Sequence, residues 1–571
     1  MRIRLVHSIT ILAFVFIAIG IFNLQIIQGR KYRELSYKNC VRLLPQDGQR
    51  GKILDRNGEL ICGSKLSYDI MILPQDKNQV DKSLFAISEV LGTGFKELKQ
   101  RFNRGFTASF IPVVVAKNIE LKKAIILGEL KSDYNNIIVQ PRALRFYPYA
   151  KLACHILGYL NEIDHWRLTK LQDYGYKTKD IVGFGGIEEK FDYYLKGQDG
   201  ALSVEVDHRG RFMRVLGFRP AAAGKDIQLT ISIKIQRIAE EGLAERKGSV
   251  IIMDPFDGQI LAMASAPGFN PAIFVNGSNS EISGLADSAL VNRAISSGYA
   301  PGSVFKLVCA SAALETGKIN LSTSYFCPGS MRIGNRQFAC WDKHNQQNLK
   351  EALAHSCDVF FYHTGLLLGP QLIHDYAVKF GLSKATGIDL PYEINGVVPD
   401  PLWKRIHKFQ SWYDGDTANF SIGQGDLSVT PIQIARLTAV FANKGKLVTP
   451  RIVMNIGGKN LSKYQKKNIN LAVKEKNINY VREDLRTVIS DPKGTANILD
   501  SLAVPVSGKT GTAQVGAGKT HGWFTGFFPA DRPKLVICVF LENNGSGHSA
   551  AAVAKQIIEA LAKENLINEK S

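Results

Sequence analysis

The chain has 571 residues, which is enough for about three or four domains of roughly 150 residues each. Hydrophobic residues make up 45% of it and charged residues 21%, which excludes a polytopic membrane protein and a wholly disordered chain. The 71 lysines and arginines outnumber the 51 aspartates and glutamates, giving a net charge of +20. This charge favours polyanionic surroundings, such as nucleic acid, anionic lipid or an anionic cell envelope, without selecting among them.

One apolar segment near the N-terminus, Leu5–Ile27, is long enough to cross a membrane as a single helix. About 23 nearly uncharged residues match a hydrocarbon core roughly 30 Å thick. A cleaved signal peptide has a shorter apolar run and small residues at its cleavage site, whereas this run ends in Leu-Gln-Ile-Ile. We therefore expect an uncleaved anchor. Basic residues flank it on both sides, so charge counting does not determine its orientation.

The chain after the anchor changes its pattern near residue 220. Residues 32–220 alternate short apolar runs with Gly, Asp and Asn turns around a charged helical stretch near residues 82–102. This pattern predicts an α+β region with modest cores. The Ala-Ala-Ala-Gly sequence at residues 221–224 indicates a joint before the next region.

The second region is predicted to contain one sheet that is completed by distant segments. A strand at residues 227–231 and a helix at 234–246 precede a hairpin at 249–263, which turns at an Asp-Gly pair. A second hairpin at 523–541 is followed by an amphipathic helix at 549–566. Because strands occur at both ends with helical material between them, we expect the two hairpins to share a sheet.

A Ser-x-x-Lys pattern, formed by Ser303 and Lys306, can supply the nucleophile and base that acyl transfer requires. It follows Ala-Pro-Gly and opens a predicted helix at residues 304–314, so Ser303 is expected in the first helical turn. Residues three apart share a helix face, which places the Lys306 amine within reach of the Ser303 hydroxyl. The pattern alone is weak, because Ser490 and Lys493 repeat it in a predicted turn.

Two further motifs follow the first one in order. Ser356-Cys357-Asp358 begins 53 residues after Ser303, and Lys509-Thr510-Gly511 begins another 153 residues later on a predicted exposed strand. Ser-x-x-Lys, Ser-Asp-Asn and Lys-Thr-Gly together are the signature of penicillin-binding proteins and serine β-lactamases. The combination therefore favours an acylated serine over a helix start with a solvated lysine.

With these motifs the chain resembles the class B penicillin-binding proteins. Three parts of the chain are similar to the three pedestal motifs of that family, which β-lactamases lack: residues 50–58, residues 145–148, and residues 183–188 together with 195–200. The Tyr-Ala-Pro-Gly-Ser context of Ser303 and the aspartate in the second motif are similar to the elongation-type subgroup, that of penicillin-binding protein 2. The resemblance covers almost everything after the anchor.

The resemblance implies an α+β fold with a single N-terminal transmembrane helix. Residues 1–30 form the cytoplasmic tail and anchor, and residues 31–220 form an extended pedestal, or dimerisation-like, domain. Residues 224–566 form a transpeptidase domain, in which helices cover an antiparallel sheet and a helical subdomain is attached. The implied location is the bacterial inner membrane, with a single pass and the catalytic domain in the periplasm.

The implied activity is that of a peptidoglycan D,D-transpeptidase, which cross-links stem peptides during cell elongation and is acylated by β-lactams. Donor stem peptides ending in D-Ala-D-Ala acylate the serine, release D-Ala and pass to an amine on a neighbouring stem. No cofactor takes part in this chemistry. The family works with a SEDS-type glycosyltransferase and rod-complex scaffold proteins, so such partners are implied, and no nucleic acid is.

The resemblance assigns roles to the residues of the first two motifs. Ser303 is implied to be the acylated nucleophile and Lys306 its general base, while Ser356 relays protons. Asp358 stands where many relatives carry an asparagine that binds the donor peptide amide. Asp358 is therefore implied to correspond to that asparagine, although an ionised carboxylate can accept hydrogen bonds there and cannot donate them.

The third motif is implied to bind the donor peptide. Lys509 holds the donor carboxylate and, as a second cation, favours the neutral form of the Lys306 amine. The backbone N–H groups of Ser303 and Thr512 form the oxyanion hole. The substrate-binding residues implied on this strand are Thr510, Gly511 and Thr512.

Cys327, Cys340, His344 and Cys357 lie within 31 residues. Three thiolates and one imidazole complete a tetrahedral zinc shell with no open position, which is typical of a structural site. The alternatives are a Cys327–Cys340 disulfide in an oxidising compartment, or independent buried thiols. Some elongation-type relatives carry ligands at similar places, so the resemblance also implies zinc, which would hold the loop before Ser356 in position.

Two other classes of protein share part of this pattern. A β-lactamase or β-lactam sensor has the same three motifs but no pedestal. A non-enzymatic cell-wall scaffold would keep the fold and lose the motifs, whereas Ser303, Lys306, Ser356 and Lys509 are all present.

Overall fold

The computed structural model describes residues 2–46, 48–74, 77–108, 111–207, 212–276, 279–461, 468–516, 518–543 and 545–568. Contacts within the chain divide it into two units. The first unit comprises Met1–Gly51, Ser64–Leu144 and Lys196–Gly224. The second unit comprises Lys52–Gly63, Arg145–Leu195 and Lys225–Ser571. Each unit is therefore assembled from three separate pieces of sequence.

The first unit begins with the apolar helix expected from the sequence. α1 (Arg2–Phe22) continues through a π-helical turn, Asn23–Ile27, and is followed by α2 (Gly29–Cys40). Leu5–Ile27 is a candidate membrane span of 23 residues with a mean hydropathy of 2.5, and none of it is buried by the rest of the protein. It is the one such helix in the described part of the chain, and it is consistent with a single membrane anchor.

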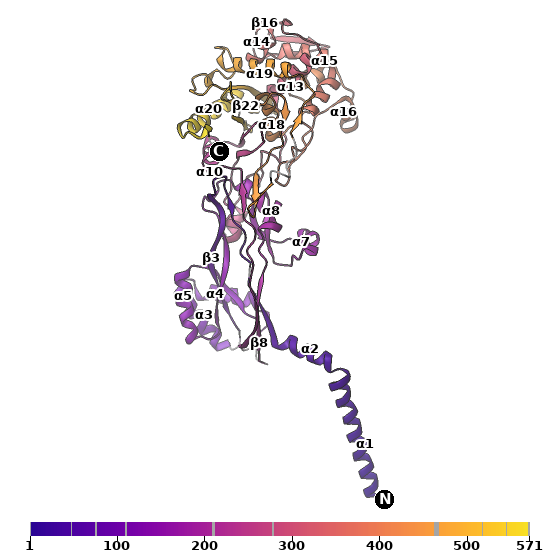
Figure 1. Ribbon diagram of the computed structural model, residues 1–571, viewed down its shortest axis with the longest axis vertical. Coiled ribbons are helices and arrows are strands. Elements are labelled where there is room, and N and C mark those ends of the chain that lie inside the picture. The colour runs from indigo at the N-terminus through magenta and orange to yellow at the C-terminus, as the bar shows by residue number, and fades with distance from the viewer. Residues whose placement is uncertain are drawn as a thin grey trace. The chain divides into compact units, whose positions relative to one another are not determined.

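Two sheets contribute strands to the first unit (Figure 1). β1 (Val41–Gln46), β8 (Gly200–Val206) and β9 (Phe212–Arg219) pair antiparallel in the order β1-β8-β9. In the second sheet, β4 (Val113–Ile119) pairs antiparallel with the C-terminal part of β3 (Leu60–Ile72). The first sheet has three strands, whereas β3 and β4 are part of a seven-stranded sheet.

Three helices pack around the second of these sheets. α3 (Lys77–Leu91) and α4 (Phe95–Gly105) replace the single helical stretch predicted near residues 82–102, and α5 (Leu121–Glu129) follows β4. β5 (Ile137–Phe146) pairs with β3. Buried residues from these helices and strands form a separate small core that includes Ile70, Leu84, Leu98, Val115 and Leu127.

A five-stranded antiparallel sheet is the centre of the second unit. The order is β12-β11-β23-β22-β21, with both predicted hairpins present and β11 paired to β23. The expectation that distant segments complete one sheet is therefore confirmed. Its strands are β11 (Gly248–Met253), β12 (Ile260–Ala266), β21 (Ser507–Gln514), β22 (Thr520–Phe528) and β23 (Leu535–Leu541).

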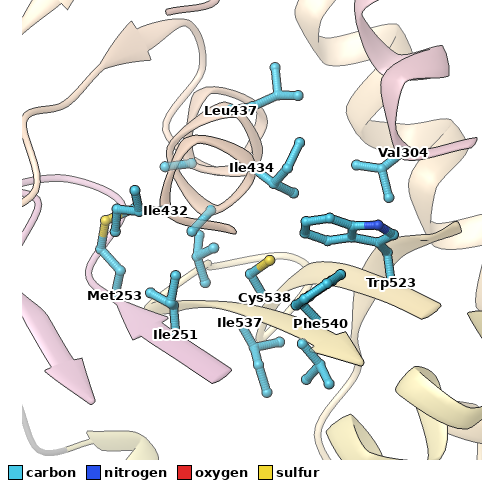
Figure 2. Close-up of a cluster of buried hydrophobic side chains, with 14 of the residues drawn as sticks. Ile251, Met253, Val304, Ile432, Ile434, Leu437, Trp523, Ile537, Cys538 and Phe540 are labelled. Atoms are coloured by element: carbon cyan, nitrogen blue, oxygen red, sulfur yellow. The ribbon is translucent and has the colours of Figure 1, made fainter. Parts of the chain in front are cut away.

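Helices cover both faces of this sheet. α10 (Ile233–Leu243) and α20 (Gly547–Lys563) pack on one face, and both were predicted from the sequence. α18 (Pro431–Ala442) packs on the other face, where every one of its residues is buried. Figure 2 shows Ile432 and Ile434 of α18 over the strands that carry Ile251 and Cys538. Helices therefore bury both faces of the sheet.

A helical subdomain continues from the sheet. α13 packs against α15 and α19, and α15 packs against α17. Two small hairpin-like pairs, β13 with β16 and β14 with β15, project from it. The helices are α13 (Lys306–Glu315), α14 (Leu349–Ala354), α15 (Asp358–Lys379), α16 (Pro401–Lys408), α17 (Asp414–Ser421) and α19 (Glu475–Ser490). The strands are β13 (Ser324–Cys327), β14 (Ser330–Ile333), β15 (Arg336–Ala339) and β16 (Asn345–Asn348).

The remaining short elements of the second unit come from several parts of the chain. β10 (Ile227–Leu229), the strand predicted at 227–231, pairs parallel with β2 (Ile53–Leu54) and antiparallel with β18 (Val453–Ile456), which pairs with β19 (Lys459–Asn460). The other short helices and strands are α6 (Cys154–Leu157), β6 (Tyr159–Glu162), α7 (His165–Leu171), β7 (Ile181–Phe184), α8 (Gly186–Lys190), α9 (Asp192–Leu195), α11 (Ile273–Asn276), α12 (Asn279–Ser283), β17 (Lys446–Leu447) and β20 (Ile469–Asn470).

A buried ion pair joins two of the segments that resemble pedestal motifs. The Arg145 guanidinium lies 2.6 Å from a carboxylate oxygen of Glu188, and the two side chains are only 1% and 0% exposed. Cys62 also donates its thiol hydrogen to this carboxylate, at 3.6 Å. Because a buried charge is costly without its partner, this pair ties three distant stretches of sequence together.

Candidate active site

The first motif lies at the N-terminal end of α13. Ser303 is half-buried in a 3-10 turn, Gly302–Phe305, and the α-helix itself begins at Lys306 rather than at residue 304. Gly302 has a φ of 55°, and a Cβ added to it would lie 2.6 Å from the carbonyl oxygen of Thr512. Glycine adopts this φ at little cost, and only a residue without a Cβ permits this close approach to the Thr512 carbonyl oxygen.

Lys306 joins the first motif to the second. Its amine is fully buried and donates hydrogen bonds to the Ser356 carbonyl oxygen at 2.8 Å and to the Ser356 hydroxyl at 3.3 Å. It also pairs with a carboxylate oxygen of Asp358 at 2.7 Å. Ser356 has a φ of 54°, a conformation rare for serine, which is compatible with the carbonyl contact to the buried amine. The structure therefore brings these three predicted residues together.

The contact with Lys306 also shows how Asp358 differs from an asparagine at this position. A carboxylate can only accept hydrogen bonds when ionised, and here it accepts one from the Lys306 amine. Asp358 is the first residue of α15, and its charge lies beside a lysine that no solvent reaches. An acidic side chain at this place thus accepts a hydrogen bond from the Lys306 amine and holds that amine in position.

Lys509 lies on β21, whose eight residues pair with β22 in an unbroken register. Its side chain is fully buried, and the amine donates to the carbonyl oxygen of Thr510 at 3.2 Å. Burial lowers the pKa of Lys509 well below its usual range, and the positive charge of Lys306 lowers it further while Asp358 opposes the shift. Lys509 therefore experiences the charges of Lys306 and Asp358, which belong to the first two motifs.

The other residues of the third motif line the same edge. Thr510 donates from its hydroxyl to that of Thr495 at 2.6 Å, and the hydroxyl of the exposed Thr512 accepts from the Gly547 backbone N–H at 2.9 Å. A Cβ added to Gly511 would lie 2.8 Å from the Pro301 carbonyl oxygen. β21 therefore touches the Ser303 turn through backbone atoms.

Sequence reasoning missed a fourth segment at this place. Gly423 accepts through its carbonyl oxygen from the Gly302 backbone N–H at 3.0 Å, and its own φ is 76°. The neighbouring Gln424 donates from its side-chain amide to the Thr512 carbonyl oxygen at 3.5 Å. The Gly-Gln-Gly sequence at 423–425 is the signal that could have drawn attention, because paired glycines often mark positive φ values.

β22, the strand after the third motif, contacts the segment around the Ser303 turn. The Trp523 indole donates to the Ala300 carbonyl oxygen at 2.9 Å, and Figure 2 shows the ring beside Val304. His521, two residues earlier, accepts from the Asn543 backbone N–H at 3.1 Å and contacts the Tyr299 ring edge-to-face. His521 is thus held within β22 by these two contacts.

The four residues of the cysteine cluster also come together. The Sγ atoms of Cys340 and Cys327 lie 3.4 and 3.7 Å from the His344 Nδ1 atom. All four ligand atoms, including that of Cys357, are within 4.8 Å of one another, and the cysteines are free thiols. In a tetrahedral zinc site with bonds of about 2.3 Å to sulfur and 2.05 Å to nitrogen, ligand atoms are about 3.6–3.8 Å apart. The donor set and its spacing fit that geometry.

The cysteine cluster contacts the second motif directly. The Asp358 backbone N–H donates to the Cys340 Sγ atom at 3.2 Å. Hydrogen bonds from Cys357 and His344 lower the pKa of the Cys340 thiol, which favours the thiolate that a metal requires. Any change in this cluster is therefore transmitted to the start of α15.

Two family models match this chain. Residues 248–559 match the penicillin binding protein transpeptidase domain, and residues 45–229 match the penicillin-binding protein dimerisation domain. Peptidoglycan D,D-transpeptidase MrdA of Acinetobacter baumannii is 31% identical over 98% of this chain and 87% of its own length. The chain belongs to the class B penicillin-binding proteins, PBP2 type. MrdA of Escherichia coli strain K12 is 30% identical over 97% of this chain and 92% of its own length.

Solved structures agree with this family assignment. The complex between PBP2 and MreC from Helicobacter pylori has a TM-score of 0.82 and 26% identity, covering 92% of this chain and 99% of that one. A chain of a peptidoglycan synthase complex has a TM-score of 0.75 and 29% identity, covering 98% of each. The fold and the peptidoglycan D,D-transpeptidase activity that the resemblance implied are thereby confirmed for this class B penicillin-binding protein.

Proposed function

We propose that Ser303, Lys306 and Ser356 carry out the acyl transfer of this peptidoglycan D,D-transpeptidase. The main support is the buried Lys306 amine, which hydrogen-bonds Ser356 and lies three residues after the half-buried Ser303. The Ser303 hydroxyl oxygen attacks the carbonyl carbon of the penultimate D-Ala. A C–O bond forms, the C–N bond to the terminal D-Ala breaks, and the Ser303 proton passes through Lys306 and Ser356 to the leaving amine.

The second half of the reaction reverses these steps with a different amine. The acceptor amine of a neighbouring stem attacks the ester carbon, its proton returns to Ser303, and the cross-linked peptide leaves. Backbone N–H groups of Ser303 and Thr512 stabilise the oxyanion in both halves. In this proposal Lys509 binds the donor carboxylate, the strand residues Thr510 and Gly511 bind the donor backbone, and Asp358 holds Lys306 in position.

Labelling with fluorescent penicillin tests this assignment. We expect a stable adduct on the wild-type protein, which Ser303→Ala abolishes. Ser490→Ala is the matched control, because Ser490 belongs to the second Ser-x-x-Lys pattern and should label normally. Labelling of Ser303→Ala at the wild-type level would overturn the proposal, and an adduct that turns over within seconds would indicate a β-lactamase instead.

We propose that the chain is anchored in the inner membrane by one helix, with the catalytic part in the periplasm. The proposed division is residues 1–30 as tail and anchor, 31–220 as pedestal and 224–566 as transpeptidase. The exposed apolar helix and the location of the substrate outside the cytoplasm support this topology. In spheroplasts, added protease should digest the chain after residue 30. Complete protection would contradict the orientation.

We propose that the protein assembles with a SEDS-type glycosyltransferase and a rod-complex scaffold protein. The support is the pair of similar structures, one described as PBP2 with MreC and one as a peptidoglycan synthase complex. Full-length protein solubilised from membranes should co-purify with both partners. Recovery of neither partner under conditions that preserve penicillin labelling would contradict this assignment.

We propose that Cys327, Cys340, His344 and Cys357 hold one structural zinc ion. The spacing of the ligand atoms and the His344 Nδ1 atom, which faces the Sγ atoms of Cys327 and Cys340, support a closed metal site in place of a disulfide. When bound, the ion would supply structure and no catalysis, because four protein ligands leave it no open position. The residues would then hold the start of α15, through the Asp358 contact to Cys340.

Metal analysis of the full-length protein tests the zinc proposal. We expect about one zinc per chain and thiols that resist alkylation until a chelator is added. Cys340→Ser should lose the metal, whereas Cys40→Ser, at the end of α2, should keep it. The absence of stoichiometric metal, together with a Cys327–Cys340 disulfide found by peptide mapping, would overturn the proposal.

A further inference from the structure

A pocket that none of the three catalytic motifs reaches lies around α7 in the second unit. Its volume is about 510 Å³, within the range of pockets that hold small ligands. All of its lining comes from one stretch of about thirty residues, between α7 and α9. The residues that matter for recognition are Trp166, Arg167, Lys170, Tyr174, Lys190 and Tyr193.

Three large aromatic side chains line this pocket and remain open to solvent. Trp166 is 60% exposed, Tyr174 is 68% exposed and Tyr193 is 70% exposed. Rings of this size are normally covered, and several of them around one cavity form flat platforms with polar edges. Such platforms suit the apolar faces of sugar rings, whose hydroxyl groups can then reach the polar edges and the solvent.

The acidic residues of the pocket are already engaged. Both carboxylate oxygens of Asp192 accept hydrogen bonds, from the Tyr176 hydroxyl at 2.5 Å and the Gly183 backbone N–H at 2.9 Å. Glu189 accepts from the Gly185 backbone N–H and from the Tyr392 hydroxyl, both at 2.5 Å. These contacts hold the wall of the pocket in place, and the two acidic residues are outnumbered by the three basic residues of the lining.

Of the three basic residues that line the pocket, one forms ion pairs within the described part of the chain and two do not. Arg167 pairs with Asp164 at 2.5 Å and with Glu189 at 3.5 Å. Lys170 and Lys190 form no ion pair with any described residue, and the Lys170 amine lies 3.6 Å over the Trp166 ring. The pocket thus offers two ammonium groups, one of them directly beside an aromatic platform, and its free charge is positive.

We propose that this pocket binds the disaccharide–peptide unit of a peptidoglycan strand at a second site, apart from Ser303. The sugar rings lie on Trp166 and its neighbours, and a carboxylate of the acidic stem peptide pairs with Lys170 or Lys190. The choice of this ligand rests on the proposed function, because a transpeptidase must hold strands that carry both amino sugars and carboxylates. Binding here would retain the strand while its stem peptides react.

Calorimetric titration of the full-length protein in detergent tests this proposal. Ser303 is first acylated with unlabelled penicillin, so that the active site is closed. The probe is a disaccharide–tripeptide, which carries carboxylates and lacks the D-Ala-D-Ala end. We expect saturable binding of one unit per chain, which weakens as salt is added. Trp166→Ala and Lys170→Glu should each raise Kd by about tenfold or more, equivalent to about 1.4 kcal/mol.

Matched controls and competing probes make the result decisive. Phe85→Ala on α3 and Lys96→Glu on α4 remove an exposed ring and an exposed charge elsewhere, and should leave Kd unchanged. The thermal unfolding midpoint of each variant checks that it is folded. Absent binding, or one Kd for all folded variants, would overturn the proposal. Equally tight binding of the free tripeptide would also overturn it and indicate an acidic-peptide site. Failure of the wild type to label with penicillin refutes the Ser303 assignment instead.

Discussion

Replacing Gly302 with alanine tests whether the close approach of β21 sets the rate of acylation. The added methyl carbon would lie 2.6 Å from the Thr512 carbonyl oxygen, whereas an ordinary contact begins at 3.4 Å. The Ser303 turn and β21 must therefore separate by about 0.8 Å, because both sides of the contact are backbone. The separation moves the Thr512 N–H, one of the two proposed oxyanion donors, away from the nucleophile.

The expected cost can be worked out from this displacement. A misplacement of about 1 Å between reacting groups reduces a rate by on the order of 100-fold, or about 2.7 kcal/mol in the barrier. We therefore expect Gly302→Ala to lower the second-order rate constant of penicillin acylation by about 100-fold. The measurement is the time course of fluorescent penicillin labelling over a range of concentrations.

Gly317→Ala is the matched control for backbone strain. Gly317 follows the other end of α13 with a φ of 67°, and no atom would lie within 4 Å of an added Cβ. Both variants place alanine in the left-handed region, at a cost of about 1–2 kcal/mol in stability, but only Gly302→Ala moves β21. Acylation of a folded Gly302→Ala protein as fast as that of Gly317→Ala would refute the reasoning.

Three other changes have outcomes that follow from the structure. Lys306→Arg should lose most penicillin labelling, because a guanidinium keeps its proton near neutral pH, and normal labelling would place the base elsewhere. Glu188→Gln should lower the unfolding free energy in urea by about 3–5 kcal/mol, because the buried Arg145 loses its carboxylate, and a negligible loss would contradict this. Burial lowers the pKa of His155 to about 4, so about 3 kcal/mol of stability should be lost as pH falls from 6.5 to 4. An equally steep loss in His155→Gln would contradict that cause.

The elements with strong local patterns were predictable from the sequence. The hairpin at 249–263 depends on an Asp-Gly turn, and the closing helix α20 depends on its apolar face, so neighbouring residues determine both. The residues around the two Ser-x-x-Lys patterns distinguish the catalytic pattern from the other one. Ser490 ends α19, and the Asp491 carboxylate accepts from the Lys493 backbone N–H at 2.8 Å, which makes that copy a turn.

The long-range arrangement of the chain could not be predicted in the same way. β2 pairs parallel with β10 across more than 170 residues, and both strands are only two or three residues long. Residues 52–63 and 145–195 belong to the second unit although first-unit segments precede and follow them. Sequence patterns describe contiguous stretches, whereas these contacts depend on which distant surfaces are complementary.

The candidate site was predictable in its reactive groups and less so in the residues that bring them together. Ser303, Lys306 and Lys509 have chemistry that a sequence pattern can reveal. The precision of their arrangement depends on glycines: a Cβ on Gly423 would lie 2.1 Å from the Gly302 carbonyl oxygen, and one on Gly511 would lie 2.8 Å from that of Pro301. Oxyanion donors must be placed to within a fraction of an ångström. The glycines allow that placement because they have no Cβ atom, so they contribute to catalysis as well as the reactive side chains.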